Sequence, residues 1–160
     1  MDNQSGMKIL MVCLGNICRS PLAEGLLRQK IQQRGLNAVV SSSGTGNYHI
    51  GEPADSRMIA TALKHDVDIS GHRARQFKVN DFDRYDLIYV MDDSNYRNMI
   101  KLARNADDSS KVHLIMDVAE PGKNLNVPDP YFGGIESFEL VFDLLNMVCE
   151  KIADNLKNQI

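Results

Sequence analysis

The residues best suited to chemistry lie in the stretch VCLGNICRSP, which begins at position 12. Cys13 is followed six positions later by Arg19, and Gly15 and Asn16 lie between them. A short apolar run precedes the stretch, and a serine and a proline typical of a helix start follow the arginine. Gly15 and Asn16 tolerate unusual backbone angles, and the first amides of a helix have no intrahelical partners. The stretch therefore predicts an anion-binding cup.

Within this cup, Cys13 would lie at the base, where amide dipoles stabilise a thiolate. Arg19 can offer a planar fork to two oxygens of a tetrahedral anion. A nucleophile beneath a bound phosphate is an arrangement for phosphoryl transfer to sulfur. Two alternatives are a small buried turn and a redox or metal pair of Cys13 with Cys18, although two cysteines alone do not complete a zinc site. Other phosphate-loop patterns are absent, since GTGNYH lacks the third glycine of a dinucleotide loop.

Four short apolar runs predict the strands that must position this loop. They cover residues 8–12, 38–42, 86–91 and 111–115, and helical patterns lie between them. Alternation of strands and helices predicts an α/β protein, a single-domain three-layer fold with a four-stranded parallel sheet flanked by helices on both faces. Ligands of such sheets bind at the carboxyl ends of the strands, where the loop after the first strand lies.

Apolar spacing and capping residues predict where the helices begin and end. Ser20 is expected to cap the first helix, with a proline at its first position and Gly35 at its end. The second helix is expected over 55–67, and Asp93 or Ser94 should cap the third. The expected buried faces are Ala23, Leu26, Leu27 and Ile31; Met58, Ile59, Ala62 and Leu63; Tyr96, Met99, Ile100 and Ala103; and Phe138, Val141, Leu145, Val148, Ile152 and Leu156.

Composition excludes several classes of protein. The chain has 160 residues, 43% apolar and 24% charged, which is typical of one soluble globular domain. Its net charge of -3 makes nucleic acid a poor candidate partner. No apolar run is long enough to form a membrane-spanning segment. Residues 1–6 are polar and are expected to form a flexible extension without the pattern of a secretory signal. Three cysteines, an odd number, indicate free thiols in a reducing cytosol, so we expect a cytoplasmic protein.

Four motifs follow one another along the chain: CLGNICRS from Cys13, SSGT from Ser42, SGHRARQ from Ser70 and DPYFGG from Asp129. Together they resemble the low-molecular-weight protein tyrosine phosphatases, over nearly the whole chain after Met7. The resemblance implies a phosphatase domain over residues 7–160. It also implies hydrolysis of protein phosphotyrosine and of small aryl phosphates, with no cofactor and no metal.

The resemblance implies roles for the catalytic groups. Cys13 would form a phosphocysteine intermediate, while Arg19 would bind the phosphate and stabilise the transition state. Asp129 would be the general acid that protonates the leaving phenolate and then takes a proton from water. It lies in a long loop, residues 116–134, which holds three of the five prolines. Ser20 would hydrogen-bond the sulfur and assist its departure.

Supporting and substrate-binding residues also follow from the resemblance. Asn16, with Ser42 and His72, would hold the loop in shape. Cys18 is close enough in sequence to act as a resolving thiol for Cys13 during oxidation. The substrate-binding residues would be Leu14, Gly15, Asn16, Ile17, Cys18, Ser20, Tyr48, Tyr131 and Phe132.

Five of the substrate-binding residues would form apolar walls above the cup. A deep slot of this kind suits an aryl phosphate and leaves the shorter phosphoserine out of reach of the nucleophile. These wall residues are Leu14, Ile17, Tyr48, Tyr131 and Phe132. In contrast, we interpret His49, His65 and His113 as ordinary polar histidines and Cys149 as a core residue.

Three other functions are compatible with parts of the pattern. Arsenate reductases that recycle through thioredoxin need two more cysteines in the middle of the chain, where none lies between Cys18 and Cys149. Phosphoarginine phosphatases carry threonine at the position of Ile17, whose larger apolar side chain favours an aryl ester. A redox-sensing or phosphotyrosine-binding module without activity is disfavoured by the intact catalytic set. The expected partners are tyrosine-phosphorylated proteins and a candidate cognate tyrosine kinase, with phosphate and other oxyanions as inhibitors.

Overall fold

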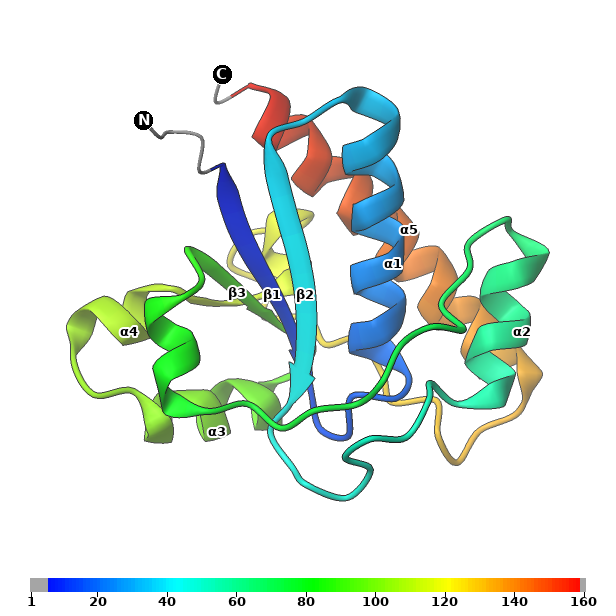
Figure 1. Cartoon of the computed structure of the whole chain (residues 1–160), viewed down its shortest axis with the longest axis horizontal. Coiled ribbons are helices and arrows are strands. Elements are labelled where there is room, and N and C mark those ends of the chain that lie inside the picture. Colours follow the sequence, from blue (N-terminus) through cyan, green and yellow to red (C-terminus); the bar gives the residue numbers. More distant parts are fainter. Residues whose placement is uncertain (1–5, 159–160) are drawn as a thin grey trace.

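The structure, a computed structural model, describes residues 6–158. Its centre is a parallel sheet of four strands in the order β2-β1-β3-β4 (Figure 1). The strands are β1 (Met7–Cys13), β2 (Ala38–Gly44), β3 (Leu87–Val90) and β4 (Val112–Leu114). The predicted four-stranded parallel sheet is confirmed. The expected N-terminal extension, residues 1–6, lies outside the described residues except for its last residue.

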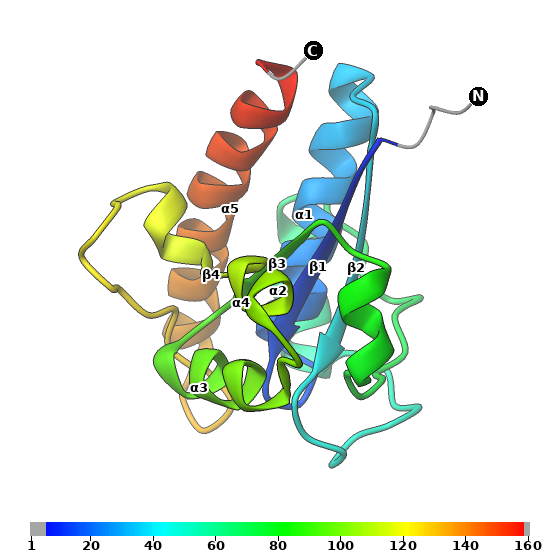
Figure 2. The same ribbon diagram turned by 90° about the vertical axis from the view of Figure 1, so that its left-hand side faces the viewer.

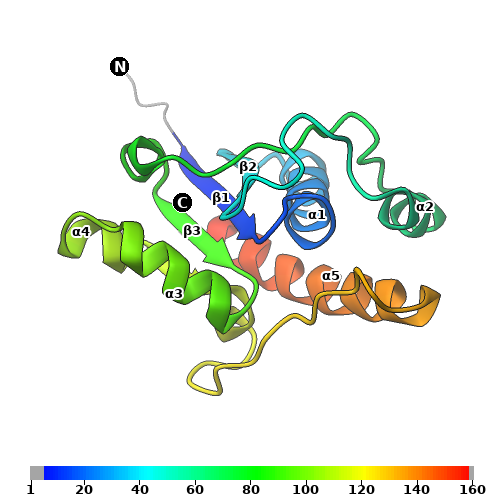
Figure 3. The ribbon, with the colours of Figure 1, turned by 90° about the horizontal axis from the view of Figure 1, so that it is seen from below.

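Helices cover both faces of this sheet and complete three layers (Figures 2 and 3). The helical segments are α1 (Arg19–Arg34), α2 (Ser56–Lys64), η1 (Val79–Asp83), α3 (Asp93–Leu102), α4 (Ala106–Ser110), η2 (Ile115–Val118) and α5 (Ile135–Lys157). Helices α1 and α5 pack side by side on one face, and α2 packs against α5. Helix α3 and η1 cover the other face.

Alternation along β1 divides the core into two apolar layers. Ile9 and Met11 are buried in the layer of α1 and α5, whereas Leu10 and Val12 are buried in the layer of α3 and η1. Both faces of this central strand are therefore shielded from water, which explains its uninterrupted apolar sequence. Cys13 ends the strand in the same layer as Ile9 and Met11, on the side where α1 begins.

The first helix begins earlier than its sequence predicts. Cys18 is the N-cap of α1 and makes no side-chain cap, so the predictions that Ser20 caps the helix and that Pro21 follows at its first position are wrong. Ser20 lies inside the first turn because its hydroxyl is drawn to the sulfur of Cys13, 3.0 Å away. Gly35 ends the helix with a positive φ of 63°, as expected.

The remaining helices differ from the predictions mainly at their ends. Helix α2 stops at Lys64 rather than at residue 67, and Leu63 is 52% exposed rather than buried. Asp92 caps α3 through its side chain, in place of Asp93 or Ser94, and Tyr96 is 37% exposed rather than buried. The short helix α4 lacks the apolar periodicity that would predict it. The predicted stripe of α5 is confirmed, since Phe138, Val141, Leu145, Val148, Ile152 and Leu156 are all buried.

None of the helices within residues 6–158 combines the length and the apolar character that crossing a lipid bilayer requires.

Candidate active site

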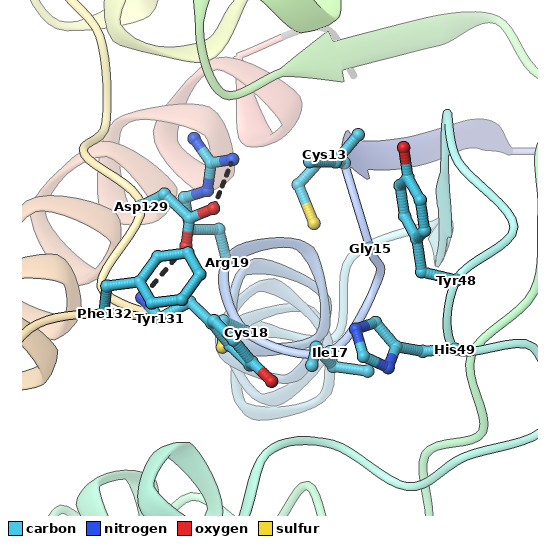
Figure 4. A pocket seen from close by; sticks show the side chains of 11 residues that line it. Cys13, Gly15, Ile17, Cys18, Arg19, Tyr48, His49, Asp129, Tyr131 and Phe132 are labelled. Carbon is cyan, nitrogen blue, oxygen red and sulfur yellow. Dashed lines mark hydrogen bonds and ion pairs between the residues drawn. The ribbon is translucent and has the colours of Figure 1, made fainter.

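A pocket of about 180 Å³ opens at the carboxyl end of β1, where Cys13 ends the strand. Its lining residues are Cys13, Leu14, Gly15, Ile17, Cys18, Arg19, Tyr48, His49, Asp129, Tyr131 and Phe132. Figure 4 shows Tyr48 and His49 on one side of Cys13, and Asp129, Tyr131 and Phe132 on the other. Cys13 itself is 3% exposed, so its sulfur lies at the floor of the pocket. Residues 13–20 are called the phosphate loop below.

The sulfur of Cys13 contacts two polar groups of its own loop. The N–H of Asn16 donates to Sγ at 3.3 Å, and the hydroxyl of Ser20 lies 3.0 Å from Sγ. The side-chain amide of Asn16 donates to the Ser20 oxygen at 2.8 Å, so the Ser20 proton can point at the sulfur or at the carbonyl of Ser43, 3.4 Å away. Donors directed at a sulfur favour its anionic, nucleophilic form.

The phosphate loop also presents unused backbone donors. Within residues 6–158, the N–H groups of Gly15, Ile17 and Cys18 have no hydrogen-bond acceptor. They belong to the turn between β1 and the N-terminus of α1, where the helix dipole favours negative charge. The loop can therefore bind an oxyanion through these N–H groups.

Asn16 holds the phosphate loop in its curled conformation. Its φ of 58° lies in the left-handed region, which asparagine adopts more readily than most residues. Its buried side chain donates to Ser42 Oγ at 3.0 Å and accepts the N–H of Arg75 at 2.9 Å. Its backbone carbonyl lies 2.7 Å from His72 Nε2. Asn16 thus ties the loop to β2 and to the segment that contains His72 and Arg75.

A second loop supports the phosphate loop from the end of β2. The N–H of Thr45 donates to the carbonyl of Cys13 at 2.9 Å, and that of Gly46 donates to the carbonyl of Leu14 at 2.9 Å. Gly44 approaches so closely that an added Cβ would lie 2.6 Å from the Leu14 oxygen. Residue 44 must therefore be glycine for the two loops to keep this spacing.

His72 lies beneath the loop in a partly buried polar pair with Glu24. Burial lowers the pKa of His72, although its bond to Asn16 and the nearby Glu24 act in the opposite direction. A neutral ring with its proton on Nε2 donates to the Asn16 carbonyl. Glu24 accepts the Ser42 hydroxyl at 2.5 Å and lies 3.9 Å from His72 Nδ1. Glu24 therefore connects the two predicted supporting residues, Ser42 and His72.

Arg19 is almost fully buried and its guanidinium is held from two sides. Nη1 donates to Asp92 Oδ2 at 2.7 Å and to the carbonyl of Val127 at 2.9 Å. Burial alone would lower the pKa of Arg19, but the anionic forms of Cys13, Asp92 and Asp129 raise it above its ordinary value. The guanidinium therefore stays charged beside Cys13, in an orientation suited to a second anion.

Asp129 approaches Arg19 from the long loop that precedes α5. Its Oδ2 lies 3.7 Å from Arg19 Nη2, and its Oδ1 accepts the N–H of Tyr131 at 3.1 Å. The side chain is 45% exposed, at the mouth of the pocket rather than at its floor. A carboxyl group in this place can meet the outer, leaving-group side of a bound phosphate.

Aromatic and apolar side chains form the upper part of the pocket. The rings of Tyr131 and Phe132 meet edge to face with centroids 5.0 Å apart. Phe132 is 96% exposed and Tyr48 is 68% exposed, so the rim of the pocket is open to a macromolecular partner. Arg57 of α2 donates to the Tyr131 carbonyl at 2.9 Å, and its guanidinium lies 5.5 Å from the Tyr131 ring centroid. This contact fixes one wall of the pocket.

The chain matches a known family of enzymes in sequence and in fold. The family model of the low molecular weight phosphotyrosine protein phosphatases matches residues 8–160. The chain belongs to this family. A Synechocystis sp. protein named for the family is 44% identical over 156 residues, which cover 96% of this chain and 99% of that protein.

Solved structures of the family share the fold. An Entamoeba histolytica protein tyrosine phosphatase superposes with a TM-score of 0.89 at 35% identity, covering 96% of this chain and 99% of that one. Vibrio vulnificus Wzb, solved in complex with benzylphosphonate, superposes with a TM-score of 0.84 at 30% identity, covering 94% and 99% of the two chains. The family resemblance and the fold inferred from the sequence are confirmed.

The structure brings the predicted site residues together in two groups. One lines the pocket and includes the candidate catalytic groups with Leu14, Gly15, Ile17, Cys18, Tyr48, Tyr131 and Phe132. The other supports the loop and consists of Asn16 and Ser20 within it and of Ser42 and His72, which contact Asn16. Asn16 and Ser20 are fully buried, and their side chains contact the loop and its sulfur; their predicted contact with substrate stays a prediction.

Sequence reasoning missed several residues of this family site. His49 lines the pocket and packs closely over Gly15. A Cβ atom added to Gly15 would lie 3.1 Å from His49 Cδ2. Asp92 anchors Arg19, and Arg57 anchors Tyr131. The only signal for His49 is its place next to Tyr48, while Asp92 and Arg57 act through contacts that no local pattern reveals.

Cys13 and Cys18 line the pocket as free thiols in the described structure, and Cys149 is a free thiol in the core. Burial is the main cause that raises the pKa of Cys18, with the carboxylate of Asp55 next. At neutral pH, Cys18 is therefore an uncharged thiol.

Proposed function

We propose that the protein removes phosphate from phosphotyrosine residues of other proteins, and from small aryl phosphates, through a phosphocysteine intermediate on Cys13. The observation that carries the proposal is the sulfur of Cys13 at the floor of a pocket whose rim holds Asp129 and whose wall holds Arg19. Membership of the family supports the same reaction. The complex of the relative Wzb with benzylphosphonate, an aromatic phosphonate, supports an aryl substrate.

In the first step, Cys13 Sγ attacks the phosphorus and a phosphorus–sulfur bond forms. The bond from phosphorus to the phenolic oxygen breaks, and Asp129 gives that oxygen its proton. Arg19 and the free N–H groups of the phosphate loop stabilise the charge on the equatorial oxygens. These donors are already fixed by Asp92 and Asn16, so little reorganisation accompanies the reaction.

In the second step, water attacks the phosphocysteine and Asp129 takes a proton from it. The phosphorus–sulfur bond breaks, inorganic phosphate forms and the thiolate returns. The hydroxyl of Ser20 near Sγ stabilises the departing sulfur. Because Asp129 acts as an acid and then as a base, both half-reactions depend on the same carboxyl group.

The depth of the pocket favours tyrosine phosphate. Leu14, Ile17, Tyr48 and Tyr131 surround the space between the sulfur and the rim, which suits a flat aromatic ring. A seryl phosphate is too short to reach the sulfur past these walls. Ile17 gives no hydrogen-bonding side chain to a guanidinium, which favours an aryl ester over phosphoarginine.

We also propose that the protein acts in the cytoplasm on tyrosine-phosphorylated proteins, with a cognate tyrosine kinase as a candidate partner. Phosphate and other oxyanions would compete for the same N–H groups and inhibit. Cys18 would resolve oxidation of Cys13 through a disulfide. Support for these proposals comes from the free thiols and from the unused donors of the loop.

A comparison of matched peptides tests the reaction and its substrate class. Peptides with phosphotyrosine, phosphoserine or phosphoarginine at one position are incubated with the wild type and with Cys13→Ser. We expect release of phosphate from the phosphotyrosine peptide alone, and none by Cys13→Ser. Faster turnover of phosphoarginine would favour the arginine phosphatase alternative, and hydrolysis by folded Cys13→Ser would refute the nucleophilic role of Cys13.

A further inference from the structure

A second hollow, of about 520 Å³, adjoins the loop that forms one wall of the active site. Tyr48 and His49 of this loop line the active-site pocket, and the next residue, Ile50, lines the second hollow. The N–H of Gly51 donates to the carbonyl of Ala74 at 2.8 Å, which fixes the loop against the chain segment behind it. Adjacent residues of one anchored loop therefore border both hollows. We call the second hollow the basic groove.

The charged side chains of the basic groove are mainly cationic. Arg75, Lys78 and Arg84 line it, and Asp81 is the carboxylate among its lining residues. Asp81 is 1% exposed, and it already accepts hydrogen bonds from Arg75 Nη1 at 3.0 Å and from the backbone N–H of Lys78 at 2.9 Å. Its charge is therefore compensated inside the protein.

Two of the cations remain available at the surface. Across residues 6–158, the ammonium group of Lys78 forms no ion pair, and Arg84 approaches Asp81 only to 3.9 Å. Both side chains belong to exposed residues. This local positive charge contrasts with the net charge of -3 of the whole chain, and it lies next to the active site rather than on a distant face.

Neutral donors and an exposed apolar edge complete the basic groove. Gln76, Asn80 and Tyr85 line it with two amides and a phenol. Ile50, a lining residue of the groove, is 59% exposed, and it follows the exposed Tyr48 by two positions in the same loop. A chain that crosses this apolar edge meets cationic and neutral donors on its far side, which is the chemistry that recognises carboxylates.

We propose that the basic groove binds acidic side chains near the phosphotyrosine of the protein substrate. This inference rests on the proposed function, and it adds a substrate class: phosphotyrosine within an acidic segment. An extended chain advances about 3.3 Å per residue, so carboxylates a few positions from the phosphotyrosine fall over the neighbouring hollow. The attraction between the groove and the acidic side chains is the same in the enzyme–substrate complex and in the transition state. It therefore lowers KM and leaves kcat unchanged.

The test compares acidic and neutral phosphotyrosine peptides on charge-reversed variants. Two acidic peptides carry three aspartates, either before or after the phosphotyrosine, and their neutral partners carry asparagine. In Lys78→Glu and Arg84→Glu, we expect kcat/KM for at least one acidic peptide to fall about threefold to tenfold, through KM. The neutral peptides should change by less than about twofold. The acidic advantage of the wild type should shrink as salt rises toward about 1 M.

Lys151→Glu provides the matched control, because it makes the same change in net charge on an exposed lysine of α5. It should leave both peptide classes unchanged. Equal effects of Lys78→Glu and Lys151→Glu, or no preference of the wild type for either acidic peptide, would overturn the proposed groove while hydrolysis of free phosphotyrosine continued. Loss of all hydrolysis by the wild type would instead count against the proposed function.

Discussion

Arg19 and Asp92 form a partly buried ion pair in which Nη1 lies 2.7 Å from Oδ2. Asp92 is also the N-cap of α3, because its Oδ1 accepts the N–H of Asn95 at 2.8 Å. One carboxylate therefore joins the start of α3 to the guanidinium beside the nucleophile. This double contact lets the two roles be separated by substitution.

Asp92→Asn keeps a cap for α3 but removes the charge that orients Arg19. We expect kcat/KM for an aryl phosphate to fall by about tenfold or more, and the free energy of unfolding to fall because the buried Arg19 guanidinium loses an anionic partner. Asp92→Ala should lose similar activity and about 1 kcal/mol more stability, because the cap of α3 is lost as well. Steady-state kinetics and urea unfolding measure the two effects. Normal kinetics in Asp92→Asn would show that Arg19 needs no anchor.

Asp129→Asn tests general acid catalysis through its dependence on the leaving group. Phenolate is a poor leaving group and needs a proton, whereas p-nitrophenolate leaves readily without one. We expect kcat for phenyl phosphate to fall about 10²-fold or more, with a much smaller loss for p-nitrophenyl phosphate. Equal losses on the two substrates would assign Asp129 a role in binding instead.

Arg57 should influence the same step from outside the pocket. Its contacts with Tyr131 hold the loop that carries Asp129, so Arg57→Ala should reproduce the leaving-group dependence of Asp129→Asn in a weaker form. We expect kcat for phenyl phosphate to fall about threefold to tenfold more than for p-nitrophenyl phosphate. Arg97→Ala, on an exposed residue of α3, is the control and should behave as the wild type.

His72 should make the stability of the protein depend on pH. Burial lowers its pKa from the ordinary value of 6.5, so the unfolded chain binds a proton there more readily than the folded chain does. The contribution of the neutral ring is complete above pH 6.5 and is lost as the pH falls through the lower pKa of the folded protein. Urea unfolding of the wild type and of His72→Gln across this range should show a weaker pH dependence in the variant. Identical pH profiles would contradict the prediction.

Oxidation provides a separate test of Cys18. Mild peroxide should convert the thiolate of Cys13 to a sulfenic acid, and the Cys18 sulfur should then displace water to give a disulfide. Because burial raises the pKa of Cys18, its attacking thiolate becomes more abundant as the pH rises, and disulfide formation should accelerate. Reductant should restore the wild type but not Cys18→Ser. Peptide mapping without a bond between Cys13 and Cys18 would refute the pairing.

The sequence predicts the sheet and the phosphate loop well because both depend on local patterns. Apolar runs identify the four strands, and CLGNICRS identifies the turn that follows β1. The prediction fails where a side chain serves a distant partner. Ser20 has the type and place of a helix cap, yet its hydroxyl faces Cys13. Leu63 continues an apolar pattern past the point where α2 leaves the core, and it is exposed.

The partners of the site residues depend on the order of strands, which no short motif encodes. Asp92 reaches Arg19 because β3 lies beside β1, and Asp92 follows soon after β3 in the chain. Glu24 meets Ser42 and His72 only after α1 packs beside β2. Neither Asp92 nor Glu24 lies in a local sequence pattern that marks it as part of a site. Their contacts with Arg19, Ser42 and His72 arise only in the tertiary structure.

The side chain and carbonyl of Asn16 join segments separated by tens of residues, through Ser42, His72 and Arg75. A chain that has not yet docked all of these segments has no template for the left-handed turn at Asn16. Enzymatic competence during refolding should therefore emerge with the last docking event rather than with early secondary structure. A nascent or partly unfolded chain would have no phosphatase activity. Substrate turnover would therefore report on completion of the tertiary structure.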